Sequence, residues 1–300
     1  MAVVALFVHQ LRSEAAGLAR DAAGWLGDRG HEVRLPPTDA AVAGLERLGV
    51  PEADLAAGLD LAVSLGGDGT MLRTVDALDG SAPVLGVNLG HLGYLAAVEP
   101  EDLHGALARW EAGAFGVEER MRLVVDVLVP GADPGGGGDD GAGQQGRRPR
   151  PGRHTALNEA VLGKTPSGQI ARVLVTVDGE PFTTYSADGL IVATPTGSTA
   201  YAWSAGGPIV SPDHQALVLT PVAPHMLFDR SLVLPPTACI RLEVVDDRPA
   251  DLSVDGRSLG LLPSGGAIVC TAATSPARLV SFGGHSFLGI LKAKFGLADR

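Results

Sequence analysis

The stretch Gly66–Thr70, with the sequence GGDGT, holds residue types suited to phosphate chemistry. It follows an apolar run at residues 61–65 that is typical of a buried strand, and apolar residues at helical spacing come after it. Glycines let a ligand approach the backbone, and the N-terminus of the following helix offers N–H groups to phosphate. A carboxylate would repel phosphate, so we expect Asp68 to act as a base for an acceptor hydroxyl or as part of a metal site. The alternative is a simple turn, because Asp-Gly is a common turn pair.

A second polar segment begins at Asp188, where an apolar strand leads into TPTGSTAY at residues 194–201. A proline and a glycine interrupt the strand, and Ser198 is expected to cap a short helix. The N–H groups of that helix and nearby hydroxyls would then form a neutral hydrogen-bonding shelf. These hydroxyls belong to Thr196, Thr199 and Ser204. The ring of Tyr201 could stack on a ligand ring, whereas the alternative is a hydroxyl-rich capped turn that binds nothing.

The first 118 residues alternate between strand and helix patterns, which indicates an N-terminal domain with a parallel α/β sheet. Buried strands are predicted at residues 3–8, 31–35, 61–65 and 83–87, and amphipathic helices at residues 14–26 and 101–111. The loops at the carboxyl ends of such strands are the usual ligand sites, and GGDGT lies in one of them.

From residue 119 the pattern changes to short β-branched strands, which predicts an all-β, sandwich-like second domain over residues 119–285. Its strands are predicted at residues 123–129, 170–177, 190–193, 217–219, 240–245, 267–270 and 279–282. Residues 130–153 hold four consecutive glycines and several arginines among prolines, and we expect a disordered loop there. A role for these arginines in phosphate binding is the alternative. A helix over residues 286–298 is expected to pack back on the first domain.

The overall composition excludes several classes of protein. The chain carries 34 acidic and 23 basic residues, a formal net charge of −11, which argues against a nucleic-acid or membrane-surface binder. Its two cysteines, Cys239 and Cys270, have no CxxC spacing, so neither a disulfide framework nor a structural zinc site is indicated. No apolar run approaches the ~20 residues that span a bilayer, and no signal-peptide pattern is present. We therefore expect a soluble, cytoplasmic protein that acts on small molecules.

Five segments together resemble the NAD kinase family, the ATP- or polyphosphate-dependent NAD 2′-phosphotransferases. They are GGDGT at residues 66–70, VLGVNLGHLGYLA at 84–96, LNE at 157–159, DGLIVATPTGSTAY at 188–201 and SAGGPIV at 204–210. GGDG alone also occurs in lipid kinases and phosphofructokinases, whereas its combination with TPTGSTAY is highly specific. The resemblance covers roughly residues 60–260. It implies an N-terminal α/β domain, a β-rich C-terminal domain and NAD bound between them.

The resemblance also implies roles for individual residues. Asp68 would accept the proton of the acceptor hydroxyl and lie beside the dinucleotide. The other implied NAD contacts are Gly69, Arg73, Asn158, Glu159, Asp188, and the adenine-side residues Thr199, Ala200, Tyr201, Ala202, Trp203 and Ser204. The implied contacts to the phosphate donor are Gly66, Gly67, Gly69 and Thr70. These roles are chemically reasonable, because amides and carboxylates suit ribose hydroxyls and a guanidinium suits phosphate.

A NAD kinase would move the γ-phosphoryl group of ATP, held with Mg²⁺, to the 2′-hydroxyl of the adenosine ribose, and the resemblance implies a homodimer or homotetramer. A lipid kinase of the same superfold is one alternative, but the LNE and TPTGSTAY segments would then have no role. A non-catalytic NAD-binding sensor is another, and the retention of Asp68 argues against it. The residues leave open the choice between ATP and polyphosphate, the choice between NAD and NADH, and the metal ligands.

Overall fold

The computed structural model describes residues 1–90, 93–95, 98–131, 148–165, 170–283 and 286–297. The chain divides into two compact units. Unit 1 comprises Met1–Arg120 and Pro276–Arg300, and unit 2 comprises Met121–Ser275. Most of the loop that the sequence predicts at residues 130–153 lies outside the described residues.

Unit 1 is built on a six-stranded sheet with the order β2-β1-β3-β4-β18-β5. Its strands are β1 (Val3–Val8), β2 (Glu32–Arg34), β3 (Leu61–Gly66), β4 (Val84–Asn88), β5 (Gly116–Arg120) and β18 (Ala277–Ser281). Strands β1 to β4 pair in parallel, as the alternating pattern predicts. Every residue of β3 and β4 is buried, because helices cover both faces of such a sheet.

Strand β18 lies in this sheet, although residues 279–282 are predicted to belong to the second domain. It pairs in parallel with β4 through Leu279 and Val84, and antiparallel with β5 over five residue pairs. The prediction that the second domain runs to residue 285 is therefore wrong, and unit 2 ends at Ser275. The sequence of a short apolar strand does not show which sheet the strand joins, because its place in a sheet depends on pairing with distant residues.

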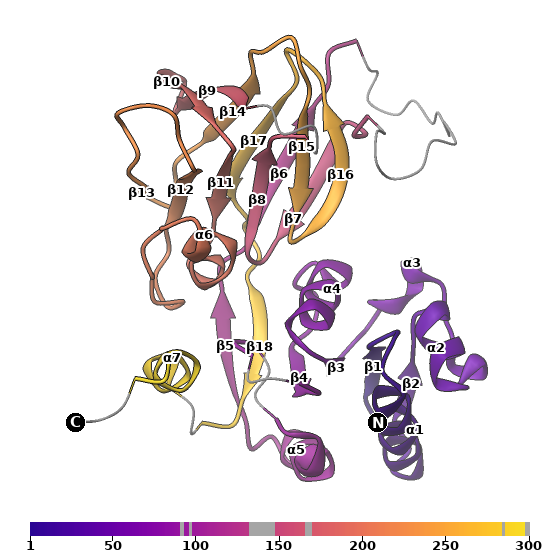
Figure 1. Ribbon diagram of the computed structural model, residues 1–300. Coiled ribbons are helices and arrows are strands. Elements are labelled where there is room, and N and C mark those ends of the chain that lie inside the picture. Colours follow the sequence, from indigo (N-terminus) through magenta and orange to yellow (C-terminus); the bar gives the residue numbers. More distant parts are fainter. Residues whose placement is uncertain (91–92, 96–97, 132–147, 166–169, 284–285, 298–300) are drawn as a thin grey trace. The chain divides into compact units, whose positions relative to one another are not determined.

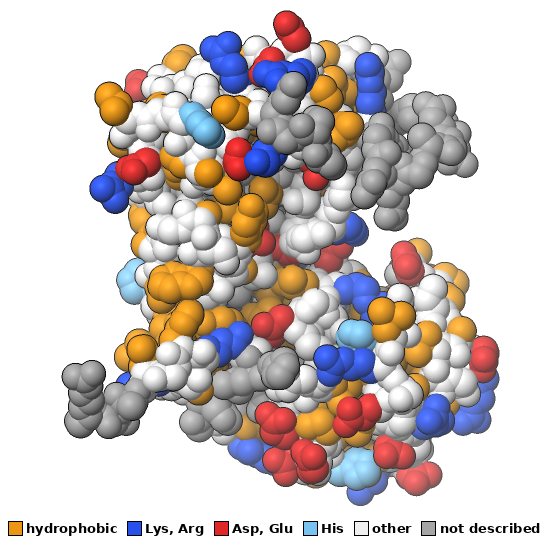
Figure 2. Space-filling model, viewed as in Figure 1, with side chains coloured by type: hydrophobic (Ala, Val, Ile, Leu, Met, Phe, Trp, Pro, Cys, Tyr) orange, Lys and Arg blue, Asp and Glu red, His pale blue; other side chains and the backbone are white. Residues whose placement is uncertain are grey.

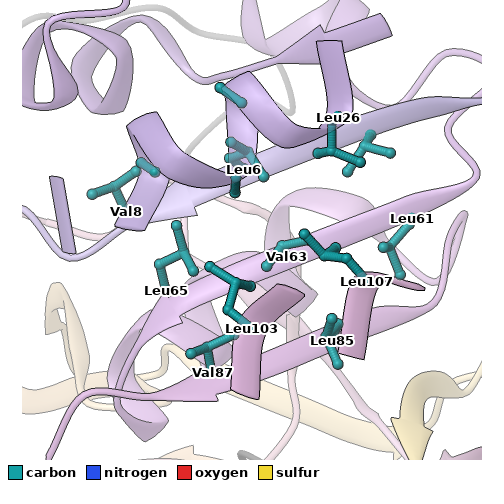
Figure 3. Packing of buried hydrophobic residues seen from close by; sticks show 14 of the residues in the cluster. Leu6, Val8, Leu26, Leu61, Val63, Leu65, Leu85, Val87, Leu103 and Leu107 are labelled. Atoms are coloured by element: carbon teal, nitrogen blue, oxygen red, sulfur yellow. The ribbon is translucent and has the colours of Figure 1, made fainter. Parts of the chain in front are cut away.

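The helices of unit 1 are α1 (Ser13–Asp28), α2 (Pro37–Ala43), α3 (Glu52–Leu55), α4 (Asp68–Leu78), α5 (Leu103–Glu111) and α7 (Phe287–Phe295), with the 3₁₀ turns η1 (Glu46–Leu48) and η2 (Pro100–Asp102). Helices α1, α2 and α5 contribute side chains to the apolar core of the sheet. Figure 3 shows Leu26 of α1, and Leu103 and Leu107 of α5, among leucines and valines of the strands. Helix α7 is the helix expected at residues 286–298. These buried contacts hold the strand ends, and hence the loops that follow them, in place.

Unit 2 contains two six-stranded antiparallel sheets, with the orders β10-β9-β14-β17-β6-β7 and β13-β12-β11-β8-β15-β16. The strands of the first sheet are β6 (Leu123–Leu128), β7 (Gly152–Ala156), β9 (Ala171–Val177), β10 (Glu180–Ala187), β14 (Ile240–Val244) and β17 (Ala267–Ala272). Those of the second are β8 (Glu159–Gly163), β11 (Gly189–Ala193), β12 (Leu217–Val222), β13 (Leu232–Leu234), β15 (Ala250–Val254) and β16 (Arg257–Leu262). Figure 1 shows the strands of both sheets within unit 2. One apolar core contains side chains of both sheets, such as Val175 and Leu252. The predicted sandwich is confirmed.

Two hairpins of unit 2 turn on the same dipeptide. Asp178 and Gly179 join β9 to β10, and Asp255 and Gly256 join β15 to β16. All four residues have positive φ, with Asp178 at 52° and Asp255 at 46°. A two-residue hairpin turn of this kind requires positive φ at both positions, which Asp-Gly tolerates well.

The surface of each unit carries charges of both signs. On the face shown in Figure 2, Lys and Arg side chains are scattered among Asp and Glu side chains rather than gathered in one patch. In the described part of the chain, no helix is both long enough and apolar enough to cross a membrane.

Candidate active site

The GGDGT segment lies at the carboxyl edge of the unit 1 sheet. Strands β3 and β4 end side by side there, with Gly66 paired to Asn88. Helix α4 follows β3 directly, with Gly67 at its N-cap and Asp68 as its first residue. The positive end of the α4 dipole therefore lies at the strand edge, where a parallel sheet usually binds its ligands.

The three glycines of this segment differ in what surrounds them. A Cβ atom on Gly66 would collide with the side chain of Thr70, so the fold itself requires glycine there. A Cβ atom on Gly67 or Gly69 would have nothing within 4 Å. Glycine at these two positions leaves the backbone open, as the approach of a phosphate would need.

The Asp68 carboxylate is fixed on one side and unpartnered on the other. The backbone N–H of Tyr94, in the loop after β4, donates to Asp68 Oδ2 at 3.2 Å. Asp68 Oδ1 is buried and has no hydrogen-bond partner among the described residues. A buried carboxylate oxygen without a donor costs free energy, and an acceptor hydroxyl would relieve that cost.

Tyr94 connects this carboxylate to the C-terminal helix. The pKa of its phenol is raised by burial and by the negative charge of Asp68. Lys294 of α7 places its Nζ 3.8 Å from the centroid of the Tyr94 ring. This cation–π contact links α7 to the loop that holds Asp68.

Arg73 of α4 is engaged within unit 1. Its guanidinium donates to both oxygens of Asp39, at 2.8 and 2.7 Å, and to the carbonyl of Val8 at 2.7 Å. Asp39 is fully buried and also accepts the Val8 N–H at 2.7 Å. This bidentate pair ties α4 to α2 and to the end of β1, so Arg73 has a structural role beside its predicted NAD contact.

The backbone of Leu157–Glu159 in unit 2 is held by one side chain, Asp255. Asp255 Oδ2 accepts the Leu157 N–H at 2.7 Å, and Asp255 Oδ1 accepts the N–H groups of Asn158 and Glu159 at 2.8 and 3.0 Å. In return, the Asp255 N–H donates to the Glu159 carbonyl at 2.9 Å. The LNE segment is thus closely tied to the β15–β16 turn.

Glu159 is a buried acid. Burial and the nearby Asp255 charge raise the pKa of Glu159 to about 8, while a bond from the Tyr201 backbone N–H lowers it. Glu159 Oε2 is buried and has no hydrogen-bond partner within the described part of the chain. The side chain therefore carries a proton at neutral pH and can donate as well as accept a hydrogen bond.

The segment at residues 194–201 packs against the LNE backbone. Thr194 donates its N–H to the Asn158 carbonyl at 2.9 Å and its hydroxyl to the Leu157 carbonyl at 2.5 Å. A Cβ atom on Gly197 would collide with the Asn158 carbonyl, which explains this glycine. The structure therefore brings the LNE and TPTGSTAY segments together.

Ser198 does not cap a helix, contrary to the sequence prediction. It lies inside the 3₁₀ turn η3 (Thr196–Thr199), and its hydroxyl donates to the Pro195 carbonyl at 2.6 Å and accepts the Val210 N–H at 2.9 Å. The Thr199 hydroxyl likewise donates to the Thr196 carbonyl. Pro195 has helical φ and ψ. The hydroxyls of this turn therefore donate to carbonyls of the turn itself, and these include the Thr199 hydroxyl that the predicted shelf would offer to a ligand.

The short helix α6 (Tyr201–Ser204) presents two aromatic side chains to solvent. Tyr201 and Trp203 are 45% and 40% exposed, whereas Ala202 is fully buried. The exposed Tyr201 ring can therefore stack on a planar ligand, and Ala202 can reach a ligand only through its backbone. The Ala202 carbonyl accepts the Gly207 N–H at 2.8 Å, and a Cβ atom on Gly207 would lie 2.7 Å from that oxygen.

Asp188 lies apart from the LNE segment. It precedes β11, at the end where Gly189 pairs with Gly163, whereas Glu159 pairs with Ala193 at the other end. The five residue steps from Asp188 to Ala193 span roughly 16 Å along an extended strand. The Asp188 carboxylate accepts a hydrogen bond from Lys164 Nζ at 2.6 Å. Within unit 2, the structure does not group Asp188 with the other predicted NAD contacts.

Two polar residues of these regions are absent from the sequence prediction. Asn88 is buried at the end of β4, and its Oδ1 has no hydrogen-bond partner in the ranges that the structure describes. Asp255 is the residue that holds the LNE backbone. An asparagine closing a buried strand and an Asp-Gly turn are visible in the sequence, but only the fold gives them these neighbours.

Comparison with known proteins agrees with this geometry. The family model described as the ATP-NAD kinase N-terminal domain matches residues 4–115, and the one described as the ATP-NAD kinase C-terminal domain matches residues 157–282. A NAD kinase of Heliobacterium modesticaldum is 40% identical over 297 residues, which cover 98% of each chain. A NAD kinase of Thermobifida fusca is 41% identical over 249 residues, 82% of this chain and 72% of the relative.

Solved structures show the same relationship. The chain is similar to yeast NADH kinase in complex with NADH, with a TM-score of 0.87 and 25% identity, over 100% of this chain and 89% of the other. It is also similar to a NAD kinase from Archaeoglobus fulgidus in complex with ATP, with a TM-score of 0.69 and 26% identity, over 98% and 97% of the two chains. The motifs, the two-unit fold and these matches lead to one conclusion: the chain belongs to the NAD kinase family of phosphotransferases.

Proposed function

We propose that Asp68 is the general base with which this NAD kinase transfers the γ-phosphoryl group of ATP to the 2′-hydroxyl of the adenosine ribose of NAD. The observation that carries the proposal is the asymmetry of the carboxylate: Tyr94 fixes Oδ2, and Oδ1 is buried without a partner among the described residues. A ribose hydroxyl is a weak nucleophile at neutral pH. A fixed carboxylate oxygen can orient the hydroxyl and accept its proton as the bond to phosphorus forms.

The donor phosphates bind, in this proposal, at the amino end of α4. Gly67 and Gly69 leave the backbone there uncovered, and the helix dipole favours negative charge. Gly66 and Thr70 contribute differently from Gly67 and Gly69, because they pack against each other and the Thr70 side chain is buried. Backbone groups that bind phosphates accept different donors, so both ATP and polyphosphate are compatible with this arrangement.

The dinucleotide contacts that we propose are those of the family resemblance. Asn158 and Glu159 offer an amide and a protonated carboxyl group to ribose or amide groups of the ligand. The segment from the end of η3 through α6 offers exposed rings and backbone groups to the adenine; its residues are Thr199, Ala200, Tyr201, Ala202, Trp203 and Ser204. Asp188, Gly69 and Arg73 complete the proposed contacts, although Arg73 is also bound to Asp39.

We propose that Mg²⁺ enters with the phosphate donor. Among the described residues, no group of three or more His, Cys, Asp or Glu side chains could hold a metal ion. Such a group is not required, because Mg²⁺ in phosphoryl transfer is commonly held by substrate phosphates, water and one or two carboxylates. When bound, Mg²⁺ would neutralise the charge that develops on the phosphates.

Two further proposals concern the protein as a whole. We propose that it works in the cytoplasm, because both of its cysteines are free thiols, which suits a reducing compartment. We also propose a homodimer or homotetramer, because closed symmetric assemblies are the usual form of soluble oligomers and the unit 2 sheets have edge strands that can pair.

The test is the variant Asp68→Asn, which keeps the shape of the side chain and removes its basicity. NADP formation from NAD should fall by roughly 10²–10⁴-fold, while NAD binding by calorimetry stays within several-fold. The loss should be the same with ATP and with polyphosphate, because the defect lies at the acceptor hydroxyl. Asp79→Asn, at the exposed end of the same helix, is the matched control.

Two outcomes would contradict the proposal. Normal turnover of Asp68→Asn would leave Asp68 as a turn residue. A variant that fails only because it no longer binds Mg²⁺-ATP would assign Asp68 to the metal instead.

A further inference from the structure

The carboxylate of Asp255 receives three consecutive backbone N–H groups, those of Leu157–Glu159, at 2.7, 2.8 and 3.0 Å. Hydrogen bonds to an ionised acceptor are shorter and stronger than neutral ones. The backbone N–H of Asp255 donates back to the Glu159 carbonyl at 2.9 Å. Four hydrogen bonds thus join one turn residue to three residues about a hundred positions earlier in the chain.

The turn geometry aims this carboxylate. Asp255 has a φ of 46°, and Gly256 has a φ of 73°. A residue with a Cβ atom is strained in this region, and Asp and Asn tolerate it better than other residues. The hairpin alone would accept glycine or asparagine at this position, so the turn does not explain why the residue is an aspartate.

The hydrogen bonds continue from Leu157–Glu159 to the adjacent segment. The carbonyls of Leu157 and Asn158 accept the hydroxyl and the N–H of Thr194, at 2.5 and 2.9 Å. Gly197 packs against the Asn158 carbonyl without room for a Cβ atom. A shift of the LNE backbone would therefore also move the start of the TPTGSTAY segment.

We propose that Asp255 is a positioning residue for NAD binding: its carboxylate holds the backbone of Leu157–Glu159 so that Asn158 and Glu159 are presented to the dinucleotide in one geometry. This inference rests on the proposed role of Asn158 and Glu159 as NAD contacts. Asp255 itself need not touch the ligand. Its removal should therefore weaken NAD binding and leave binding of the phosphate donor unchanged.

The chain contains a matched control for this role. Asp178 and Gly179 form the other Asp-Gly hairpin turn of unit 2, with φ values of 52° and 83°. Asp178 Oδ1 accepts the N–H of Cys239 at 2.8 Å, and the Asp178 N–H donates to the Cys239 carbonyl at 2.9 Å. Asp178 therefore has the same turn conformation and a similar structural role, but it holds a residue that is not a proposed NAD contact.

The experiment compares Asp255→Gly with Asp178→Gly. Glycine accepts positive φ, so each variant keeps its turn and loses only the carboxylate. We expect Asp255→Gly to raise the KM for NAD by about tenfold or more, because three charge-assisted hydrogen bonds are lost. The KM for ATP should stay within about twofold. Both variants should lower the Tm, by similar amounts, but Asp178→Gly should leave the KM values for NAD and ATP unchanged.

A second variant, Asp255→Asn, keeps the side-chain volume and tolerates the turn. In this variant an amide N–H₂ group would replace one carboxylate oxygen and face a backbone N–H, so one hydrogen-bond acceptor is lost. We therefore expect the same selective rise in the KM for NAD, but a smaller one. Kinetics are measured at a temperature at which circular dichroism shows all variants to be folded. Folded Asp255→Asn and Asp255→Gly enzymes with a normal KM for NAD would overturn the inference.

The variant Asn158→Ala separates this inference from the proposed site. If Asn158→Ala raises the KM for NAD and the Asp255 variants do not, Asp255 is not a positioning residue although the site stands. If Asn158→Ala has no effect, the proposed NAD contact is wrong and the inference falls with it. An equal rise in the KM values for NAD and ATP in Asp255→Gly would also overturn it, because that pattern indicates general damage to the fold.

Discussion

The side chain of Asp68 occupies the space that a Cβ atom on Gly93 would need. Gly93 belongs to the loop after β4, and the next residue, Tyr94, donates its N–H to Asp68 Oδ2 at 3.2 Å. The GGDGT motif and the loop after β4 are therefore parts of one arrangement. In this loop, Gly93 leaves room for the Asp68 carboxylate, and Tyr94 supplies the hydrogen bond that fixes it.

We predict that Gly93→Ala lowers turnover without unfolding unit 1. The new methyl group would displace the Asp68 carboxylate, and a misplacement of about 1 Å at a reacting group can cost roughly 10²-fold in rate. Steady-state NADP formation checks this. Gly24→Ala in α1 is the control, because a Cβ atom there meets nothing within 4 Å. Unchanged turnover in Gly93→Ala would show that the exact position of the carboxylate is unimportant.

We predict that Asp188→Ala raises the KM for NAD more than the KM for ATP. The substitution removes a proposed polar partner of the dinucleotide and leaves ligand groups unpaired. Lys164→Ala breaks the same ion pair from the other side and keeps the Asp188 carboxylate, so it should leave the KM for NAD near the wild-type value. If both variants behave alike, the ion pair rather than the carboxylate matters.

We predict that Glu159 makes the stability of the protein depend on pH. Its pKa is about 8 in the folded protein against an ordinary 4.5, so between these values the folded chain holds a proton that the unfolded chain has released. The free energy of unfolding therefore falls by several kcal/mol as the pH rises through this window. Glu159→Gln removes this titration. Tm measured from pH 5 to pH 9 should decline more steeply in the wild type than in Glu159→Gln, and parallel curves would disprove the raised pKa.

We predict that deletion of residues 135–150 leaves folding and NAD phosphorylation nearly intact. Strands β6 and β7 are antiparallel neighbours, with Val127 opposite Gly152, so a shorter connection can join them. Loop shortening costs little when the ends are already close. NADP formation and Tm of the deletion variant check this. Loss of most activity in a folded variant would place the arginines of this loop, such as Arg148 and Arg150, in a phosphate site.

The sequence by itself determined the local features of this protein. The apolar strand before Gly66, the glycine turn and the helix after it are read correctly from residue spacing, because hydrophobic periodicity acts over one element. The β-rich character of the second unit follows in the same way. The specific combination of GGDGT with TPTGSTAY was enough to indicate the family, which the comparisons confirm.

The tertiary structure decided which distant groups meet. It placed β18 beside β4 and paired Arg73 with buried Asp39. It also gave the Ser198 hydroxyl a carbonyl partner and brought the Asp255 carboxylate within hydrogen-bond distance of the LNE backbone. None of these contacts leaves a periodic mark in the sequence, since each joins groups whose separation along the chain is unrelated to their separation in space. A short strand, an arginine or an Asp-Gly turn has several satisfactory partners, and only packing of the whole unit selects one of them.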